Sequence, residues 1–99
     1  MNDGSLELVV ATVAREAEDL GYESLRRPVA ETALFGGSEG IDSLSLVRLV
    51  SAVERAAERE FGRRVVLADE KAMSMRNSPF RTVRTLAELL SQRLAAGNA

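Results

Sequence analysis

The 99-residue sequence contains neither cysteine nor histidine. Without cysteine, the chain has no disulfides, no thiolate nucleophile and no thiol ligand for a metal ion. Without histidine, it lacks the side chain most often used as a general base near neutral pH. We therefore expect that the chain is not an enzyme by itself and holds no metal, and that any thiol chemistry comes from a cofactor.

Aromatic residues and long apolar runs are also scarce. Aromatic residues make up 4% of a sequence that is 45% hydrophobic, so the core must consist of leucine, valine and alanine, which suits closely packed helices. No stretch reaches the roughly 20 apolar residues that span a bilayer, and Met1 to Ser5 carry no basic segment of a signal peptide. These features predict one small domain, residues 1–99, that is soluble and cytoplasmic.

Charge is distributed unevenly along the chain. Residues 1–70 hold fourteen acidic residues against eight basic ones, a net charge of −6, whereas residues 71–99 carry a net charge of +4. The overall charge of −2 argues against nucleic acid as the main partner. A helical bundle that binds nucleic acid through the basic C-terminal third, with Arg76, Arg81 and Arg84, stays open as an alternative.

Apolar residues recur at the helical period in several segments, which favours an all-α fold. Glycines follow the first two of these segments, where a helix commonly ends. We expect three main helices and one short one, with a long first loop, in a small four-helix bundle. The predicted helices span residues of about 5–20, 43–61, 69–76 and 83–95.

The long connection from Tyr22 to Gly40 needs an anchor, because unstructured loops of this length are uncommon in compact domains. We expect Leu34 and Phe35 to dip into the core, and Ala30 to Ala33 to form one helical turn.

The start of the last helix predicts two further contacts. Thr82 can act as its N-cap. Arg81 and Arg84 then lie at the positive end of the helix dipole, where each cation is unfavourable by about 0.3–1 kcal/mol. We expect an ion pair with an acidic helix to offset this cost.

The second helix begins with the most informative motif, Gly40-Ile41-Asp42-Ser43-Leu44. Asp42 is a good N-cap residue, because its carboxylate can accept from free amides of the first turn, so the helix should begin at Ser43. The Ser43 hydroxyl then lies at the positive end of the helix dipole and faces solvent. An attached phosphodiester would be well placed there.

This motif and the helix after it resemble the attachment site of acyl carrier proteins. The resemblance lies in residues 40–47, Gly-Ile-Asp-Ser-Leu-Ser-Leu-Val, and in a long helix that ends in Glu60-Phe61-Gly62. Helix order and loop length are similar to that family over nearly the whole chain. The resemblance implies a bundle of the acyl-carrier type. It also implies that a phosphopantetheinyl transferase, recognising Asp42 and Leu44, attaches the 4'-phosphopantetheine arm of coenzyme A to Ser43.

The implied function is that of an acyl carrier protein. The arm would hold acyl groups as thioesters and shuttle them between acyl-loading and acyl-processing enzymes of fatty-acid, lipid or polyketide-type biosynthesis. We expect a monomer whose partners dock on one side of the second helix. The predicted docking residues are Leu44, Val47, Arg48, Ser51 and Arg55.

The charged residues on the docking side of the second helix differ from those of the family. Carriers of fatty-acid synthesis usually have several carboxylates along this helix, whereas this chain has Arg48 and Arg55. The departure favours a specialised stand-alone carrier. Two alternatives remain: a peptidyl or aminoacyl carrier of a nonribosomal pathway, which a different charging enzyme would reveal, and an unmodified helical adaptor, which no transferase would label.

Overall fold

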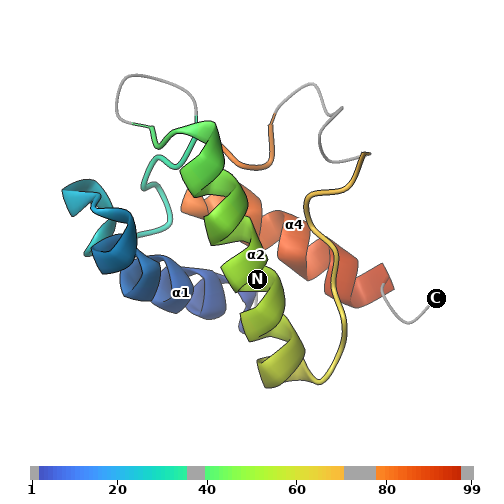
Figure 1. The fold of residues 1–99 in the computed structure, drawn as a ribbon. Helices are drawn as coiled ribbons and strands as arrows, with labels where there is room; N and C mark the ends of the chain where they lie inside the picture. The colour runs from blue at the N-terminus through green and yellow to red at the C-terminus, as the bar shows by residue number, and fades with distance from the viewer. Residues whose placement is uncertain (1–2, 36–39, 71–77, 97–99) are drawn as a thin grey trace.

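The computed structural model describes residues 3–35, 40–70 and 78–96. Within these residues there are three α-helices, a single 3-10 turn (η1) and no strand, so the described chain is an all-helical small bundle (Figure 1). An isolated antiparallel bridge joins Ala33 to Thr82. The short helix expected at 69–76 lies for the most part on residues 71–77, outside those described. The elements are α1 (Ser5–Leu20), η1 (Glu23–Leu25), α2 (Ser43–Phe61) and α4 (Val83–Ala96).

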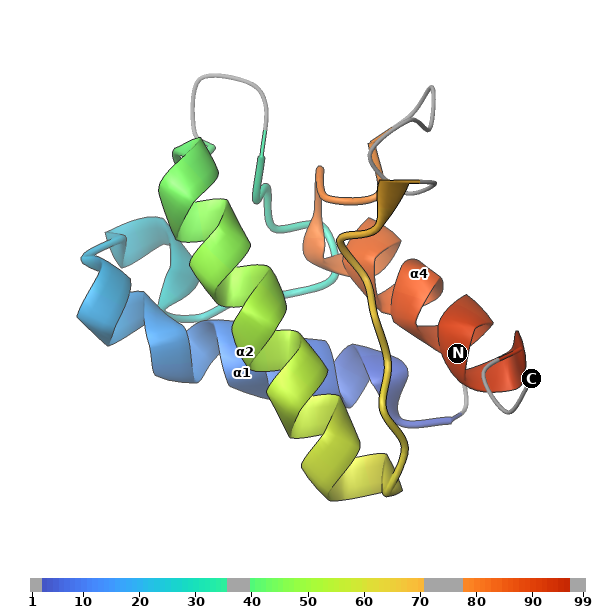
Figure 2. The ribbon, with the colours of Figure 1, turned by 45° about the vertical axis from the view of Figure 1, so that its right-hand side comes forward.

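Helix α1 lies at the centre of the packing, because it contacts both α2 and α4. After α2 the chain reverses at Gly62, and the following linker runs back alongside α2 in both views (Figures 1 and 2). One contact that fixes this path is the hydrogen bond from the amide of Leu67 to Oε2 of Glu54, at 2.7 Å. Helix α2 is therefore flanked by α1 on one side and by the linker on the other.

The ends of α1 and α2 coincide with the predicted residues, and α4 extends one residue further, to Ala96. Gly21 and Gly62 stop the first two helices in the left-handed conformation, at φ 80° and 67°. Their amides donate to the carbonyls of Ala17 and Glu58, each at 2.9 Å. Glycine suits both positions because it has no Cβ to clash at positive φ.

The core combines apolar side chains of the three helices with buried side chains of the connecting segments, among them Leu25, Leu67 and Phe80. Side chains of all three helices meet there, and the hydroxyl of Thr12, a buried polar residue of α1, donates to the Leu8 carbonyl at 2.8 Å. Close packing of these small aliphatic side chains supplies the main stabilising term of such a domain. Fully buried members include Val9, Val13, Leu49, Val53, Leu86 and Leu90.

The loop before α2 is anchored as predicted. Leu34 is completely buried and Phe35 is half-buried against the core. The amide of Leu34 donates to the Arg81 carbonyl at 2.7 Å, and its own carbonyl accepts from the amide of Ile41 at 2.7 Å. Leu34 therefore ties the loop both to the segment before α4 and to the segment before α2.

The expectation of a helical turn at Ala30 to Ala33 is wrong. Residues 29–32 form a β-turn, in which the amide of Thr32 donates to the Val29 carbonyl at 3.1 Å. The carbonyls of Ala30 and Thr32 instead accept from the first amides of α4, those of Arg84 at 2.8 Å and Val83 at 3.0 Å. The loop backbone thus satisfies amide donors that α4 leaves unpaired at its start.

Side chains complete the start of α4. The Thr85 amide donates to the Thr82 hydroxyl at 3.2 Å and the Thr82 amide donates to the Thr85 hydroxyl at 3.0 Å, a reciprocal cap that confirms the predicted role of Thr82. Arg84 forms the expected ion pair, but its partner is Glu31 in the loop rather than an acidic helix. The hydrogen bond from Arg84 lowers the pKa of Glu31.

Candidate functional site

The site is built around the N-cap of α2. Asp42 is in an extended conformation, at φ −75° and ψ 168°, and its Oδ1 accepts from the amide of Ser45 at 2.7 Å. Its backbone carbonyl accepts the first intrahelical bond, from Leu46 at 2.9 Å. The prediction that Asp42 caps a helix beginning at Ser43 is confirmed.

Tyr22, which is not among the predicted site residues, belongs to the same cluster. Its hydroxyl donates to Oδ2 of Asp42 at 3.1 Å and accepts from the Asp42 amide at 3.2 Å. The hydrogen bond from the Ser45 amide, which has the larger effect, and the one from the Tyr22 hydroxyl both stabilise the charged carboxylate. The pKa of Asp42 therefore lies below its usual range. The one sequence signal for Tyr22 is its place directly after the helix-ending Gly21.

The two residues that follow the cap point outward. Ile41, before the cap, is buried and fixes the chain to the core, whereas Ser43 is exposed and the side chain of Leu44 is 82% exposed. The Ser43 hydroxyl has no hydrogen-bond partner among the residues the structure describes. The arrangement presents a hydroxyl nucleophile at a helix N-terminus, next to an exposed apolar side chain.

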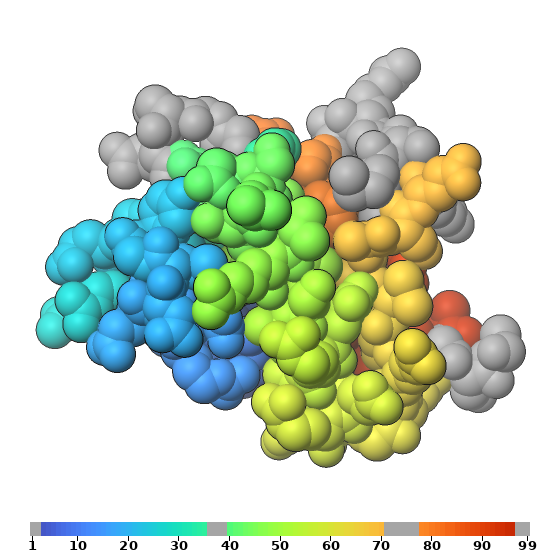
Figure 3. Space-filling view, in the orientation of Figure 1, coloured from blue at the N-terminus to red at the C-terminus, as the bar shows by residue number. Residues whose placement is uncertain are grey.

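The predicted docking residues fall into two groups. Leu44 and Val47, the latter 60% exposed, present apolar side chains to solvent on α2. Ser51 is half-buried and Arg55 is exposed further along the same outward side. Figure 3 shows α2 crossing the front face of the molecule.

Arg48 is drawn toward α1 instead. Its guanidinium lies 3.9 Å from a carboxylate oxygen of Glu16 and 3.8 Å from one of Asp19, and the side chain is 55% exposed. These long, exposed pairs contribute little stability. They do bring the charge of Arg48 to the boundary between α1 and α2, away from the outward stripe.

Two further kinds of site find no support in the described ranges. Residues 3–35, 40–70 and 78–96 contain no group of three or more acidic residues that could hold a metal ion. None of the helices within these ranges is both long and apolar enough to cross a bilayer.

Comparisons of the chain with protein-family models, with curated proteins and with solved structures found no match in any of the three. The proposal for its function therefore rests on the residues of this chain and their geometry.

Proposed function

We propose that this chain is an acyl carrier protein in which Ser43 bears a 4'-phosphopantetheine arm. The observation that carries the proposal is the exposed Ser43 at the capped start of α2, with the exposed Leu44 beside it. This is the position at which the sequence resembles the attachment site of acyl carriers.

The local chemistry suits such an attachment. The first-turn amides of α2 and its dipole favour a negative phosphodiester at Ser43. The neighbouring carboxylate of Asp42 is turned toward the Ser45 amide and the Tyr22 hydroxyl, so its charge is partly compensated. A hydroxyl without a competing hydrogen bond is available for reaction.

In the proposed reaction this chain supplies the nucleophile and a recognition surface. The Ser43 oxygen forms a bond to the pantetheine-side phosphorus of coenzyme A, and the bond from that phosphorus to the oxygen bridging the two phosphates breaks. The adenosine bisphosphate portion leaves, and the hydroxyl proton passes to a base of the transferase, which also holds Mg²⁺. Asp42 and Leu44 are the residues that the transferase would contact first.

Once attached, the arm supplies a terminal thiol that holds acyl groups as thioesters. Partner enzymes would then approach the outward side of α2, where Leu44 and Val47 offer apolar contacts and Arg55 offers a positive charge. Binding energy at interfaces concentrates in a few residues that become fully desolvated, and an arginine is often among them. Both the two aliphatic residues and Arg55 are therefore candidates to carry that recognition.

Intact-mass measurement tests the proposal. The purified chain is incubated with coenzyme A, Mg²⁺ and a broad-specificity phosphopantetheinyl transferase, together with Ser43→Ala and, as a matched control on the same helix, Ser51→Ala. We expect the parent and Ser51→Ala to gain one phosphopantetheine group and Ser43→Ala to gain none. A folded, helical parent that stays unmodified here and with a transferase from its own host would contradict the proposal.

A further inference from the structure

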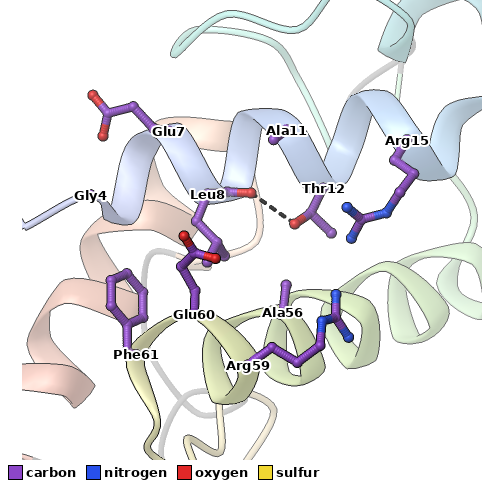
Figure 4. A pocket seen from close by; sticks show the side chains of 10 residues that line it. All are labelled: Gly4, Glu7, Leu8, Ala11, Thr12, Arg15, Ala56, Arg59, Glu60 and Phe61. Carbon is purple, nitrogen blue, oxygen red and sulfur yellow. Dashed lines mark hydrogen bonds between the residues drawn. The ribbon is translucent and has the colours of Figure 1, made fainter.

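A hollow lies between α1 and α2 at the end of α2 remote from Ser43 (Figure 4). Its volume is about 350 Å³, at the lower end of the range for small-molecule sites. At a rise of about 1.5 Å per residue, Phe61 lies roughly 27 Å along the helix from Ser43. The hollow is therefore separate from the proposed attachment site. Its lining includes Leu8, Thr12, Arg15, Ala56, Arg59 and Phe61.

Two arginines line this hollow from opposite helices. Arg15 projects from α1 toward α2, and Arg59 lies along α2, so that in Figure 4 the two guanidinium groups lie at the same end of the hollow. Neither forms a hydrogen bond or an ion pair with another residue of the described ranges. Arginine does not lose its charge at any physiological pH, so two permanent positive charges border one hollow. Glu7 and Glu60 also line the hollow, but neither forms an ion pair with Arg15 or Arg59.

Another arginine at the boundary between α1 and α2 does have acidic partners. Nearer the start of α2, Arg48 lies within 4 Å of two carboxylates of α1, Glu16 and Asp19. At the hollow, Arg15 lies on the α1 side of the boundary and Arg59 on the α2 side. The sequence thus places two positive charges on facing helices, and their mutual repulsion is unfavourable. An anion bound between the two guanidinium groups would attract both and make the arrangement favourable.

The rest of the lining is largely apolar. Ala56 is buried, and Leu8 and Phe61 are half-buried, with exposed edges toward the hollow. The Thr12 hydroxyl is engaged with the carbonyl of its own helix. Figure 4 shows Glu60 near Leu8 and Phe61, away from the two guanidinium groups, so an anionic group is disfavoured at that end. The hollow thus has a cationic end and an apolar, weakly acidic end.

We propose that this hollow binds a small organic anion, in which a phosphate or carboxylate lies between Arg15 and Arg59 and a compact apolar group covers Leu8 and Phe61. Guanidinium groups pair with either oxyanion through two parallel hydrogen bonds. The apolar surface adds affinity that a bare inorganic ion does not gain. This site does not depend on modification of Ser43.

NMR titration of the amides tests the site at low ionic strength, with phenyl phosphate, benzoate and inorganic phosphate as probes. We expect saturable shifts confined to residues 8–15 and 56–61, and tighter binding of phenyl phosphate than of inorganic phosphate. Arg15→Gln and Arg59→Gln should each weaken binding about tenfold, the effect of losing one charge-assisted hydrogen-bonded contact. Benzoate binding as well as phenyl phosphate would assign the site to oxyanions in general, and phenyl phosphate alone to phosphate esters.

Three variants serve as controls. Arg64→Gln removes an exposed arginine from the linker and should leave the affinity unchanged. Glu60→Gln removes the negative charge near the apolar end and should tighten binding, an effect that a damaged fold would not produce. Ser43→Ala should bind as the parent does. Shifts that do not saturate, or an Arg64→Gln variant weakened as much as Arg15→Gln and Arg59→Gln, would overturn the proposal.

Discussion

The hydroxyl of Tyr22 and the carboxylate of Asp42 join the end of α1 to the start of α2. The hydroxyl donates to Oδ2 at 3.1 Å while it accepts from the Asp42 amide at 3.2 Å. Tyr22 directly follows the left-handed Gly21 that ends α1, and Asp42 directly precedes Ser43. The orientation of Asp42, the residue before Ser43, is therefore fixed by two contacts, one with the Ser45 amide of α2 and one with the Tyr22 hydroxyl just after α1.

Replacing Tyr22 by phenylalanine should loosen the first turn of α2 while leaving the fold intact. The ring remains, but both hydrogen bonds to Asp42 are lost. We expect hydrogen exchange at the Ser45 amide to rise roughly two- to tenfold, since each exposed hydrogen bond contributes modestly. Exchange at buried amides in the middle of α2, such as that of Val53, serves as the internal reference and should stay unchanged. Equal exchange at Ser45 in both proteins would contradict a positioning role for Tyr22.

The cap of α2 should respond to acid in a defined direction. The Ser45 amide, chiefly, and the Tyr22 hydroxyl hold the pKa of Asp42 below its usual range. Its contribution to stability is therefore complete above the pKa of an unfolded aspartate and is lost as pH falls through the lower folded value. An NMR titration of the side-chain carboxyl should show this low pKa in the parent and a higher value in Tyr22→Phe. A parent carboxyl that titrates at or above the usual value would disprove the assignment.

Leu34 should be the main apolar anchor of the long loop. It is fully buried, so Leu34→Ala should lower the free energy of unfolding by about 2–5 kcal/mol through lost burial and a residual cavity. The matched control is Val29→Ala in the same loop, where a side chain 58% exposed should cost less than about 0.5 kcal/mol. Urea unfolding measures both values. Similar losses in the two variants would show that the loop is not held through Leu34.

The bounds of the helices followed from local sequence. Gly21 and Gly62 end α1 and α2 where the apolar period stops, and Asp42 begins α2 with a side-chain cap, so each end was visible within a few residues. The burial of Leu34 was also predictable, because a long loop in a small domain needs an apolar anchor.

Contacts between distant segments were not predictable in this way. The expected helical turn at Ala30 to Ala33 failed because the carbonyls of Ala30 and Thr32 accept from α4, more than fifty positions later. The partner of Arg84 is Glu31 in the loop, and the partner of Asp42 is Tyr22, for the same reason. Pairings of this kind depend on how the helices pack, which periodicity alone does not determine.

The outward side of α2 yields a prediction tied to the proposed function. Leu44→Ala should lower the kcat/KM of the transferase by about tenfold, because it removes an exposed apolar contact next to Ser43. The free energy of unfolding should change by less than about 0.5 kcal/mol. Val66→Ala removes another exposed apolar side chain, 54% exposed and on the linker, and should leave the kinetics unchanged. Equal rates in the parent and Leu44→Ala would argue against recognition at Leu44.

The most direct test of the central claim is the mass of the protein isolated from its own host, followed by fragmentation to locate any added group. We predict that the isolated protein includes a form carrying one phosphopantetheine group, and that fragmentation places the group on Ser43. A group located on another residue, or a protein that is wholly unmodified in the host and stays so with the host transferase, would contradict the account.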